Sequence, residues 1–207
     1  MQAVLTGDIV NSTKLTKAKE AKLTHSLSSI FIEVNSKFDF YRGDSFQAYV
    51  KNSENALRLA LLCRTAAIKL FKADKIILSD VRISVGIGQV NTPVRSLKTA
   101  KGEAFILSGR AFDEITKNNQ RLAININNPL AHEGLQVIAD YLNAIFDAMT
   151  GKQAEAIFEL LKGEMQQVVA KKIRRTKSTI HQRITSGRWP EIEKLLQQYE
   201  NIIKLIV

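Results

Sequence analysis

The chain has 207 residues, of which 45% are hydrophobic and 24% charged, so its composition excludes a disordered chain. The formal net charge of +10 favours a polyanionic partner, with nucleic acid ahead of a nucleotide or a membrane surface. No segment reaches the roughly 20 apolar residues of a membrane helix, and the N-terminus lacks the basic region of a signal peptide. The one cysteine, Cys63, excludes an intramolecular disulfide. We therefore expect a cytoplasmic protein without membrane contact.

Strand and helix patterns alternate over the first 126 residues. Apolar and alternating runs predict strands over 3–5, 38–42, 45–50, 81–88 and 122–126. Spacings of three and four predict helices over 15–34, 52–72 and 103–116, with Asn11, Ser12 and Thr13 as candidate N-caps of the first. Gly43 and Asp44 predict a tight hairpin turn. This order predicts an α+β fold, a ferredoxin-like sandwich with helices packed on a mainly antiparallel sheet.

From residue 131 onward the patterns are helical only. We expect a first domain over 1–130, a linker helix over 131–149 and a C-terminal all-α domain over 150–207. Within the last domain, residues 165–184 resemble a helix-turn-helix. Its expected core residues are Val169, Ile173, Ile180 and Ile184, and the small Ala170 allows the helices to cross closely. Arg174 stands at the turn position where such motifs often have glycine.

Basic residues concentrate on this motif, because Glu164 is the one acidic residue between positions 162 and 188. Concentrated positive charge is what phosphate contact requires. We assign three polar residues to DNA base edges: Ser178, His181 and Gln182. We assign the basic residues to DNA phosphates: Lys171, Lys172, Arg174, Arg175, Lys177 and Arg183. The alternative is a solvated basic appendage of three helices that serves dimerisation.

Four segments in the first domain resemble motifs of class III nucleotidyl cyclases. They cover residues 7–13 (GDIVNST), 41–46 (YRGDSF), 81–88 (VRISVGIG) and 102–110 (GEAFILSGR). With its helical tail, the whole chain resembles the bacterial SatD family. The resemblance implies a cyclase-like sandwich that uses divalent metal and a nucleoside triphosphate.

The first two motifs place a carboxylate at a strand end, Asp8, and another in a neighbouring hairpin, Asp44. Two such carboxylates suit Mg²⁺ or Mn²⁺, which stabilises charge on phosphoryl oxygens. The resemblance implies that Asp8 and Asp44 are metal ligands, with the backbone of Ile9 contributing, and that Arg110 neutralises transition-state charge. Backbone amides near Asn11, Ser12 and Thr13 suit phosphate at a helix N-terminus. Alternatively, Asp8 caps a helix and Asp44 is a turn residue.

Other family positions are altered. Ile106 replaces the asparagine that contacts ribose, Phe40 replaces the lysine that reads adenine, and the region of the purine-reading aspartate holds Thr99. We therefore expect a DNA-binding transcriptional regulator whose degenerate cyclase-like domain senses a nucleotide or metal, or forms a homodimer. The alternatives are a metal-dependent enzyme acting on a nucleoside triphosphate, and a scaffold that binds a protein partner.

Overall fold

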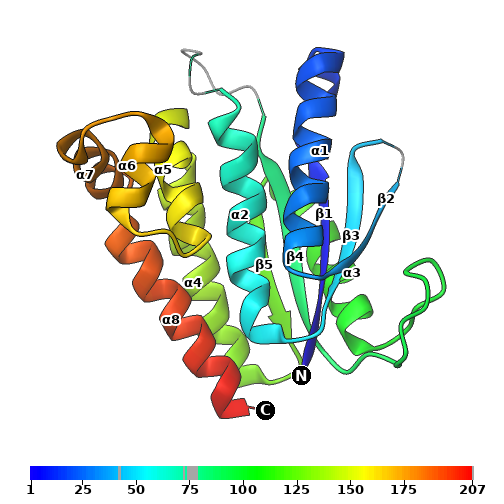
Figure 1. Cartoon of the computed structure of the whole chain (residues 1–207). Coiled ribbons are helices and arrows are strands. Elements are labelled where there is room, and N and C mark those ends of the chain that lie inside the picture. The colour runs from blue at the N-terminus through cyan, green and yellow to red at the C-terminus, as the bar shows by residue number, and fades with distance from the viewer. Residues whose placement is uncertain (42, 72, 74–78, 207) are drawn as a thin grey trace.

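Figure 1 shows the computed structural model of the chain, which describes residues 1–41, 43–71, 73 and 79–206. The described strands are β1 (Gln2–Ile9), β2 (Lys37–Tyr41), β3 (Ser45–Val50), β4 (Val81–Gly88) and β5 (Leu122–Ile126). They form one sheet in the order β2-β3-β1-β4-β5, in which only β4 and β5 run parallel. The expected strand end at Arg42 and helix end at Lys72 lie outside the described residues.

The described α-helices are α1 (Lys17–Glu33), α2 (Ala56–Lys69), α3 (Glu103–Lys117), α4 (Pro129–Asp147), α5 (Gly151–Leu161), α6 (Gln166–Ile173), α7 (Lys177–Ser186) and α8 (Trp189–Ile206). Two short 3-10 turns, Ser12–Lys14 and Ser53–Asn55, precede α1 and α2. The order β1-α1-β2-β3-α2-β4 is the ferredoxin-like arrangement. The predicted α+β sandwich with a helical C-terminal region is confirmed. None of the described helices is long and apolar enough to cross a bilayer.

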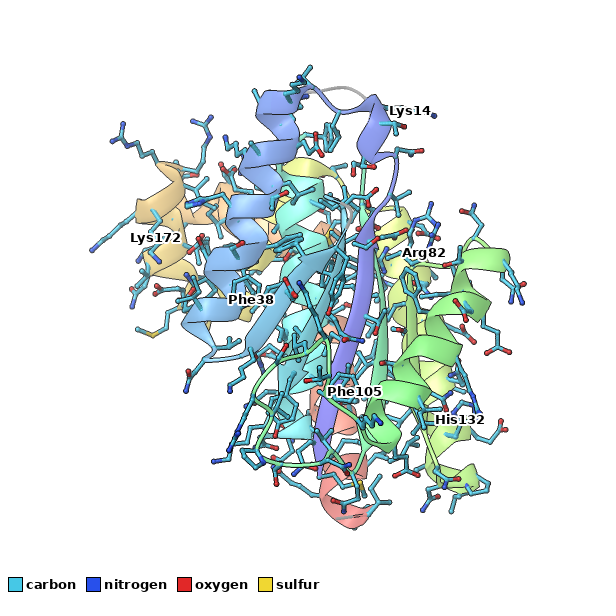
Figure 2. The ribbon with its side chains drawn as sticks, turned by 90° about the vertical axis from the view of Figure 1, so that its right-hand side faces the viewer. Lys14, Phe38, Arg82, Phe105, His132 and Lys172 are labelled. Atoms are coloured by element: carbon cyan, nitrogen blue, oxygen red, sulfur yellow. The ribbon has the colours of Figure 1, made fainter. Side chains whose placement is uncertain are left out.

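Alternation along the strands gives the sheet two different faces. Leu5, Phe46, Val85 and Ile124 belong to one buried cluster with residues of α1, α2 and α4, which cover this face. The other face carries the polar side chains of β1, β3 and β4, and α3 packs over its β4 side. Figure 2 shows Lys172 and Arg82 on opposite sides of the sheet.

Gly86 of β4 sets how closely α3 approaches the sheet. A Cβ atom at this position would lie 2.3 Å from both the Ala104 carbonyl oxygen and the Ser108 amide nitrogen. The helix backbone therefore rests directly on the strand. Next to this contact, the Ser84 hydroxyl donates a 2.7 Å hydrogen bond to the Ser108 carbonyl and ties the two elements together.

Side chains of α4 cover the outer edge of β5. Gln136 Nε2 donates to the Ile124 carbonyl at 2.9 Å, and Asn143 Nδ2 donates to the Leu122 carbonyl at 3.0 Å. An unpaired strand edge invites pairing with another chain. These two amides satisfy carbonyls that would otherwise be open to a foreign strand.

Two hydrophobic cores meet in the C-terminal half. Buried residues of α4, α5 and α8, such as Leu142, Ile157 and Tyr199, belong to the same large core as the sheet. A small second core joins α5, α6 and α7, and Trp189 packs against both. The expected domain boundary near residues 130–150 stays a prediction, and the large core runs across it.

Candidate functional site

Asp8 and Asp44 lie at the same end of the sheet. Asp8 is the next-to-last residue of β1 and pairs in register with Ser45 at the start of β3. The Ile9 amide donates to the Asp44 carbonyl at 3.0 Å, which joins the strand end to the hairpin turn. Gly43 has a φ of 89°, a conformation that favours glycine, as the predicted turn requires. The strands therefore bring the two carboxylates together.

The environment of Asp8 disfavours its charge. Its Oδ2 accepts from Arg82 Nη1 at 3.1 Å, while its Oδ1 is buried and has no hydrogen-bond partner. Burial raises the pKa of Asp8, Arg82 opposes this rise, and the nearby Asp44 charge adds to it. A cation beside Oδ1 would supply the missing partner.

Asp44 is held by two hydroxyl groups. Ser12 Oγ donates to its Oδ2 at 2.7 Å, and Ser45 Oγ donates to its Oδ1 at 3.3 Å. Ser12, which we expected at a phosphate, therefore orients a carboxylate in this structure.

The expected helix N-terminus at Asn11, Ser12 and Thr13 is wrong. Helix α1 begins at Lys17, and its N-cap is Thr16, whose hydroxyl accepts from the Lys19 amide at 3.3 Å. Residues 11–13 instead enter a three-residue 3-10 turn, and Asn11 has a φ of 56°. The helix-dipole argument for phosphate at these residues is therefore lost, although they still lie beside Asp44.

The donor set at Asp8 and Asp44 fits a hard divalent cation. Mg²⁺ is commonly held by one or two carboxylates and fills its remaining positions with water and substrate oxygens. No group of three or more His, Cys, Asp or Glu side chains suited to a metal occurs among the described residues. A cation bound here would therefore take most of its ligands from solvent or substrate.

The other cyclase-motif positions lie on α3 and on the apolar face of the sheet. Arg110 is exposed on α3, and no described contact joins it to Asp8 or Asp44. Ile106 is 55% exposed on the same helix. Phe40 packs on the apolar face of the sheet, with its ring centroid 5.8 Å from that of Phe46. A base-reading residue at position 40 would therefore have to leave the core.

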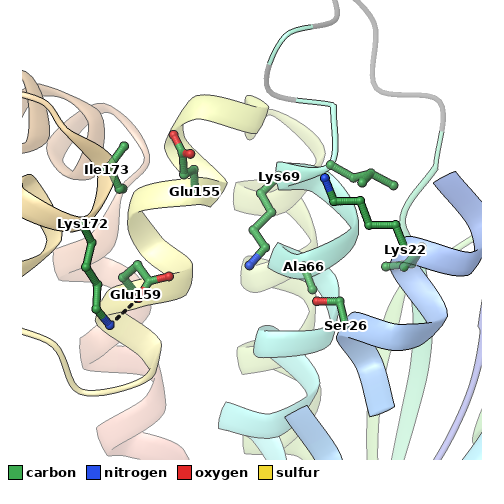
Figure 3. Close-up of a pocket in the computed structure, with 10 residues that line it drawn as sticks. Lys22, Ser26, Ala66, Lys69, Glu155, Glu159, Lys172 and Ile173 are labelled. Atoms are coloured by element: carbon green, nitrogen blue, oxygen red, sulfur yellow. Dashed lines mark hydrogen bonds and ion pairs between the residues drawn. The ribbon is translucent and has the colours of Figure 1, made fainter. Parts of the chain in front are cut away.

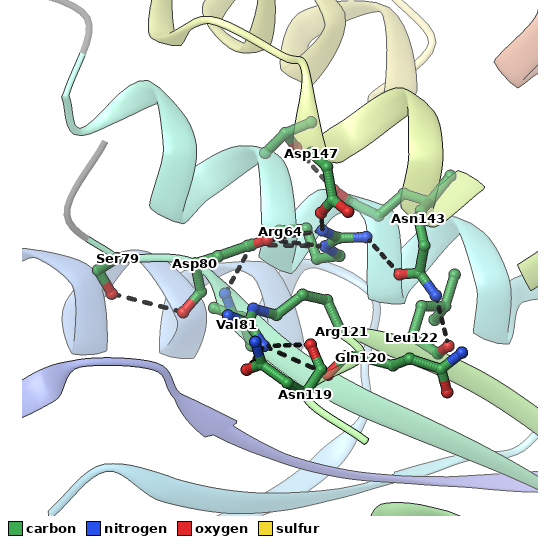
Figure 4. Close-up of polar contacts among 12 residues, drawn as sticks. Arg64, Ser79, Asp80, Val81, Asn119, Gln120, Arg121, Leu122, Asn143 and Asp147 are labelled. Atoms are coloured by element: carbon green, nitrogen blue, oxygen red, sulfur yellow. Dashed lines mark hydrogen bonds and ion pairs between the residues drawn. The ribbon is translucent and has the colours of Figure 1, made fainter. Parts of the chain in front are cut away.

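Arg64 forms a buried polar network next to this end of the sheet (Figure 4). Its side chain is fully buried on α2 and donates to Asp80 at 2.6 Å and to Asn143 at 3.1 Å. The Val10 amide donates to the Asp80 carbonyl, and Ser79 Oγ donates to the Val10 carbonyl. The network thus fixes the backbone just beyond Asp8. We did not identify Arg64 from the sequence. The one sequence feature that points to it is a charged residue inside an otherwise apolar helix.

Two short helices of the C-terminal region are joined by a tight turn. Helices α6 and α7 are joined by residues 174–176 and pack with α5 around Ala156, Val169, Ala170, Ile180 and Ile184. Arg174 has a φ of 55°, so arginine occupies a left-handed position that glycine normally takes. Thr176 caps α7, because its hydroxyl accepts from the Thr179 amide at 3.1 Å. Of the expected core residues, Val169, Ile180 and Ile184 are buried, and Ile173 is partly buried against them.

Most of the residues that we assigned to DNA are exposed on the protein surface. The exposed residues are Lys171, Lys172, Arg174, Arg175, Lys177, Ser178, His181 and Gln182. We expected Arg183 to face outward as well, and this is wrong. Its side chain is 13% exposed, and its Nη1 lies 3.1 Å from Glu155 on α5.

Lys172 also forms ion pairs within the chain. It pairs with Glu159 at 3.1 Å and with Glu164. These hydrogen bonds raise the pKa of Lys172, Glu164 contributing more than Glu159. The acidic residues Glu155 and Glu159 lie before position 162 in the sequence, but α5 places them beside the motif. The local positive charge is therefore smaller than the sequence suggested.

Comparisons with known proteins give distant likeness only. No protein-family model matches the chain and no curated protein matches it, so the resemblance to the SatD family stays a prediction. Among solved structures, the adenylyl cyclase CyaB from P. aeruginosa has 16% identity and a TM-score of 0.42, over 55% of this chain and 71% of that one. The guanylyl cyclase Cya2 has 15% identity and a TM-score of 0.37, over 55% of this chain and 69% of that one.

The active GGEEF domain of a diguanylate cyclase from Vibrio cholerae has 15% identity and a TM-score of 0.43, over 61% of this chain and 83% of that one. The identities to these three proteins lie under 20% and the TM-scores under 0.5. The activities of these enzymes therefore do not transfer to this chain, which is distantly similar in structure to nucleotidyl and diguanylate cyclase domains.

Proposed function

We propose that this chain is a DNA-binding regulator in which α7 enters the major groove. One observation carries the proposal. Four exposed basic residues surround the turn between α6 and α7, Lys171, Arg174, Arg175 and Lys177, and none of them takes part in an ion pair among the described residues. Lys172, Arg183 and Arg188 are each paired with glutamates. Four unpaired positive charges thus lie close together, where a helix-turn-helix meets the DNA backbone.

The exposed face of α7 suits base contact. Its ten residues span about 15 Å, and such a helix fits the major groove. Ser178 lies in the first turn, the part of a recognition helix that reaches base edges, and His181 and Gln182 follow one turn later. Gln182 can form paired hydrogen bonds with adenine. A homodimer would place two such helices on neighbouring half-sites.

The test is fluorescence anisotropy of labelled duplex DNA with the full-length protein across a salt series. The double variant Lys171→Ala and Lys177→Ala removes two phosphate contacts, so the slope of log affinity against log salt should fall by roughly two. The control, Lys101→Ala with Lys117→Ala, has the same net charge and changes exposed residues of the other half. Salt-insensitive binding, or equal loss in both variants, would contradict the proposal.

A second candidate function is divalent cation and nucleotide binding at Asp8 and Asp44, either as a sensor or as a metal-dependent enzyme acting on a nucleoside triphosphate. The buried, unpartnered Oδ1 of Asp8 beside a second carboxylate supports it. A bound Mg²⁺ or Mn²⁺ would supply positive charge to phosphoryl oxygens. Asp8 and Asp44 would hold the ion, and Ser12 and Ser45 would orient Asp44.

Paramagnetic resonance of Mn²⁺ measures this binding directly. Asp44→Asn should abolish the Mn²⁺ binding of the wild type, because only one of the two carboxylates, Asp8, remains. Asp39→Asn is the matched control, since Asp39 lies on β2 and pairs with Lys98 at 3.9 Å. Equal Mn²⁺ binding by both variants would contradict the site. Unchanged turnover of nucleoside triphosphates in Asp44→Asn would exclude the enzyme.

A further inference from the structure

Two cavities of this chain differ in the charge of their walls. The smaller one, of about 280 Å³, lies between α1, α2, α5 and α6, and Figure 3 shows Glu159 paired with Lys172 in its wall. In the same lining, Glu155 pairs with Arg183, and Lys69 lies over the ring of Phe158. These charges are satisfied within the chain and leave little for a ligand.

The larger cavity, of about 460 Å³, has mostly uncharged walls. It lies where α1 ends, β3 ends and α2 begins, and its volume is within the usual range for small-molecule sites. The apolar part of the lining consists of Val34, Val50, Leu59 and Leu62. The polar, uncharged part consists of Asn35, Ser36, Asn52 and Asn55.

The fold brings these polar residues together. Lys37 pairs in register with Tyr49, so the neighbouring Ser36 and Val50 lie beside each other at the ends of β2 and β3. Asn52 Oδ1 accepts from the Glu54 amide at 3.1 Å, which leaves the Nδ2 donor of this carboxamide.

The other two carboxamides keep both their donor and their acceptor. Asn55 stands at the N-cap position of α2, but its side chain does not cap the helix. In the described part of the chain, the side chains of Asn35 and Asn55 form no hydrogen bond. The cavity thus presents donors and acceptors that the fold does not use.

The two cations of the lining do not make this cavity a site for anions. Arg58 donates to the Leu161 carbonyl and pairs with Glu200, both at 3.4 Å. Lys51 is exposed, so water screens its charge. Val34, by contrast, is apolar and still 44% exposed. A ligand that covers it would remove apolar surface from water.

From this lining we infer that the cavity binds a small uncharged molecule in which a carboxamide or lactam edge is attached to an apolar ring. A carboxamide side chain carries a donor beside an acceptor, so it pairs with a group that presents both. The apolar ring would cover Val34 and Leu59. Because β3 runs from Ser45, next to Asp44, to Val50 at the cavity, the carboxylate pair lies about 17 Å away along the strand.

The test is equilibrium dialysis of the full-length protein with three probes of similar shape. We expect 2-naphthamide to bind saturably with one molecule per chain. The ketone 2-acetonaphthone lacks the donor and should bind roughly tenfold more weakly, because a polar group of the cavity stays unpaired. The anion 2-naphthoate should also bind more weakly than the amide. Equal binding of the ketone, stronger binding of the anion, or no saturable binding of the amide would overturn the proposal.

Two variants locate the binding. Asn55→Ala removes a carboxamide that the fold does not use, so it should weaken 2-naphthamide roughly tenfold and the ketone less. Val34→Ser should weaken both neutral probes, because it removes apolar surface from the cavity. Asn91→Ala is the control, since it removes an exposed asparagine from the loop before α3.

Thermal unfolding of each variant shows whether the fold is kept. Equal effects of Asn55→Ala and Asn91→Ala would place the amide outside the cavity and contradict the inference. The dialysis contains neither DNA nor a divalent cation, so its outcome is independent of both proposed functions.

Discussion

Asp8 and Arg82 face each other directly across β1 and β4, with 3.1 Å between Oδ2 and Nη1. Each keeps one polar atom buried and unpartnered, Oδ1 of Asp8 and Nε of Arg82. Burial raises the pKa of Asp8 even though Arg82 opposes the rise. The ion pair therefore does not offset the cost of keeping this carboxylate charged in the folded chain.

Asp8→Asn should raise the Tm at neutral pH. The pKa of Asp8 in the folded chain lies above its ordinary value of 3.8, so the folded state keeps this proton to higher pH than the unfolded state. The contribution of the Asp8 carboxyl to the free energy of unfolding therefore falls as pH rises from 3.8 through the folded pKa. This contribution stays low at pH 7. Thermal unfolding at pH 4 and pH 7 measures the difference. A lower Tm for Asp8→Asn than for the wild type at pH 7 would contradict this.

Arg64→Ala should destabilise the chain by about 3–5 kcal/mol, because it leaves the Asp80 carboxylate without its buried partner. Urea unfolding measures this loss. Arg58→Ala is the control: its pair with Glu200 at 3.4 Å is 38% and 23% exposed, and it should cost less than about 1 kcal/mol. Similar losses in the two variants would show that the Arg64 network adds nothing beyond an exposed ion pair.

Gly86→Ala should cost about 1–3 kcal/mol, because its Cβ forces the backbone of α3 away from β4. Gly109→Ala on α3 is the opposite case. Its Cβ meets nothing within 4 Å, so alanine should stabilise the helix by about 0.5–1 kcal/mol. Chemical denaturation measures the change in the free energy of unfolding of each variant. A loss of stability in Gly109→Ala would contradict the packing described for α3.

Arg174→Gly should separate stability from DNA affinity. Glycine adopts the φ of 55° at this position without steric cost, so the variant should gain about 1 kcal/mol of stability. Arg174→Ala removes the same charge and keeps the strain. Both variants should lose DNA affinity equally, with the salt slope reduced by roughly one. Thermal unfolding and anisotropy on the same samples test this, and unchanged DNA affinity in both would remove Arg174 from the interface.

Local patterns predicted most of the fold. The alternation of residues 81–88, the turn at Gly43 and the apolar spacings of the helices each depend on neighbours in sequence, and the corresponding elements are present. The start of α1 was harder. We named Asn11, Ser12 and Thr13 as candidate N-caps, whereas the N-cap of α1 is Thr16, a residue type equally suited to this position.

The polar contacts of the candidate sites depend on distant pairs. Asp80 lies 16 residues from Arg64, Asn143 lies 79 residues from it, and Glu155 lies 28 residues from Arg183. No local pattern predicts which of several charges will meet across packed helices. For this reason we identified Asp8 and Asp44 as neighbours from the hairpin, but missed Arg64 and misplaced Arg183.

Trp189 is the one tryptophan of the chain, and it packs against both the large core and the small core of the motif. Indole emission depends on how much water reaches the ring. Separation of the two cores would expose this ring, so the emission maximum would shift to longer wavelength. The chain thus carries an intrinsic optical reporter of movement between the α6–α7 pair and the sheet, which can be followed without a label.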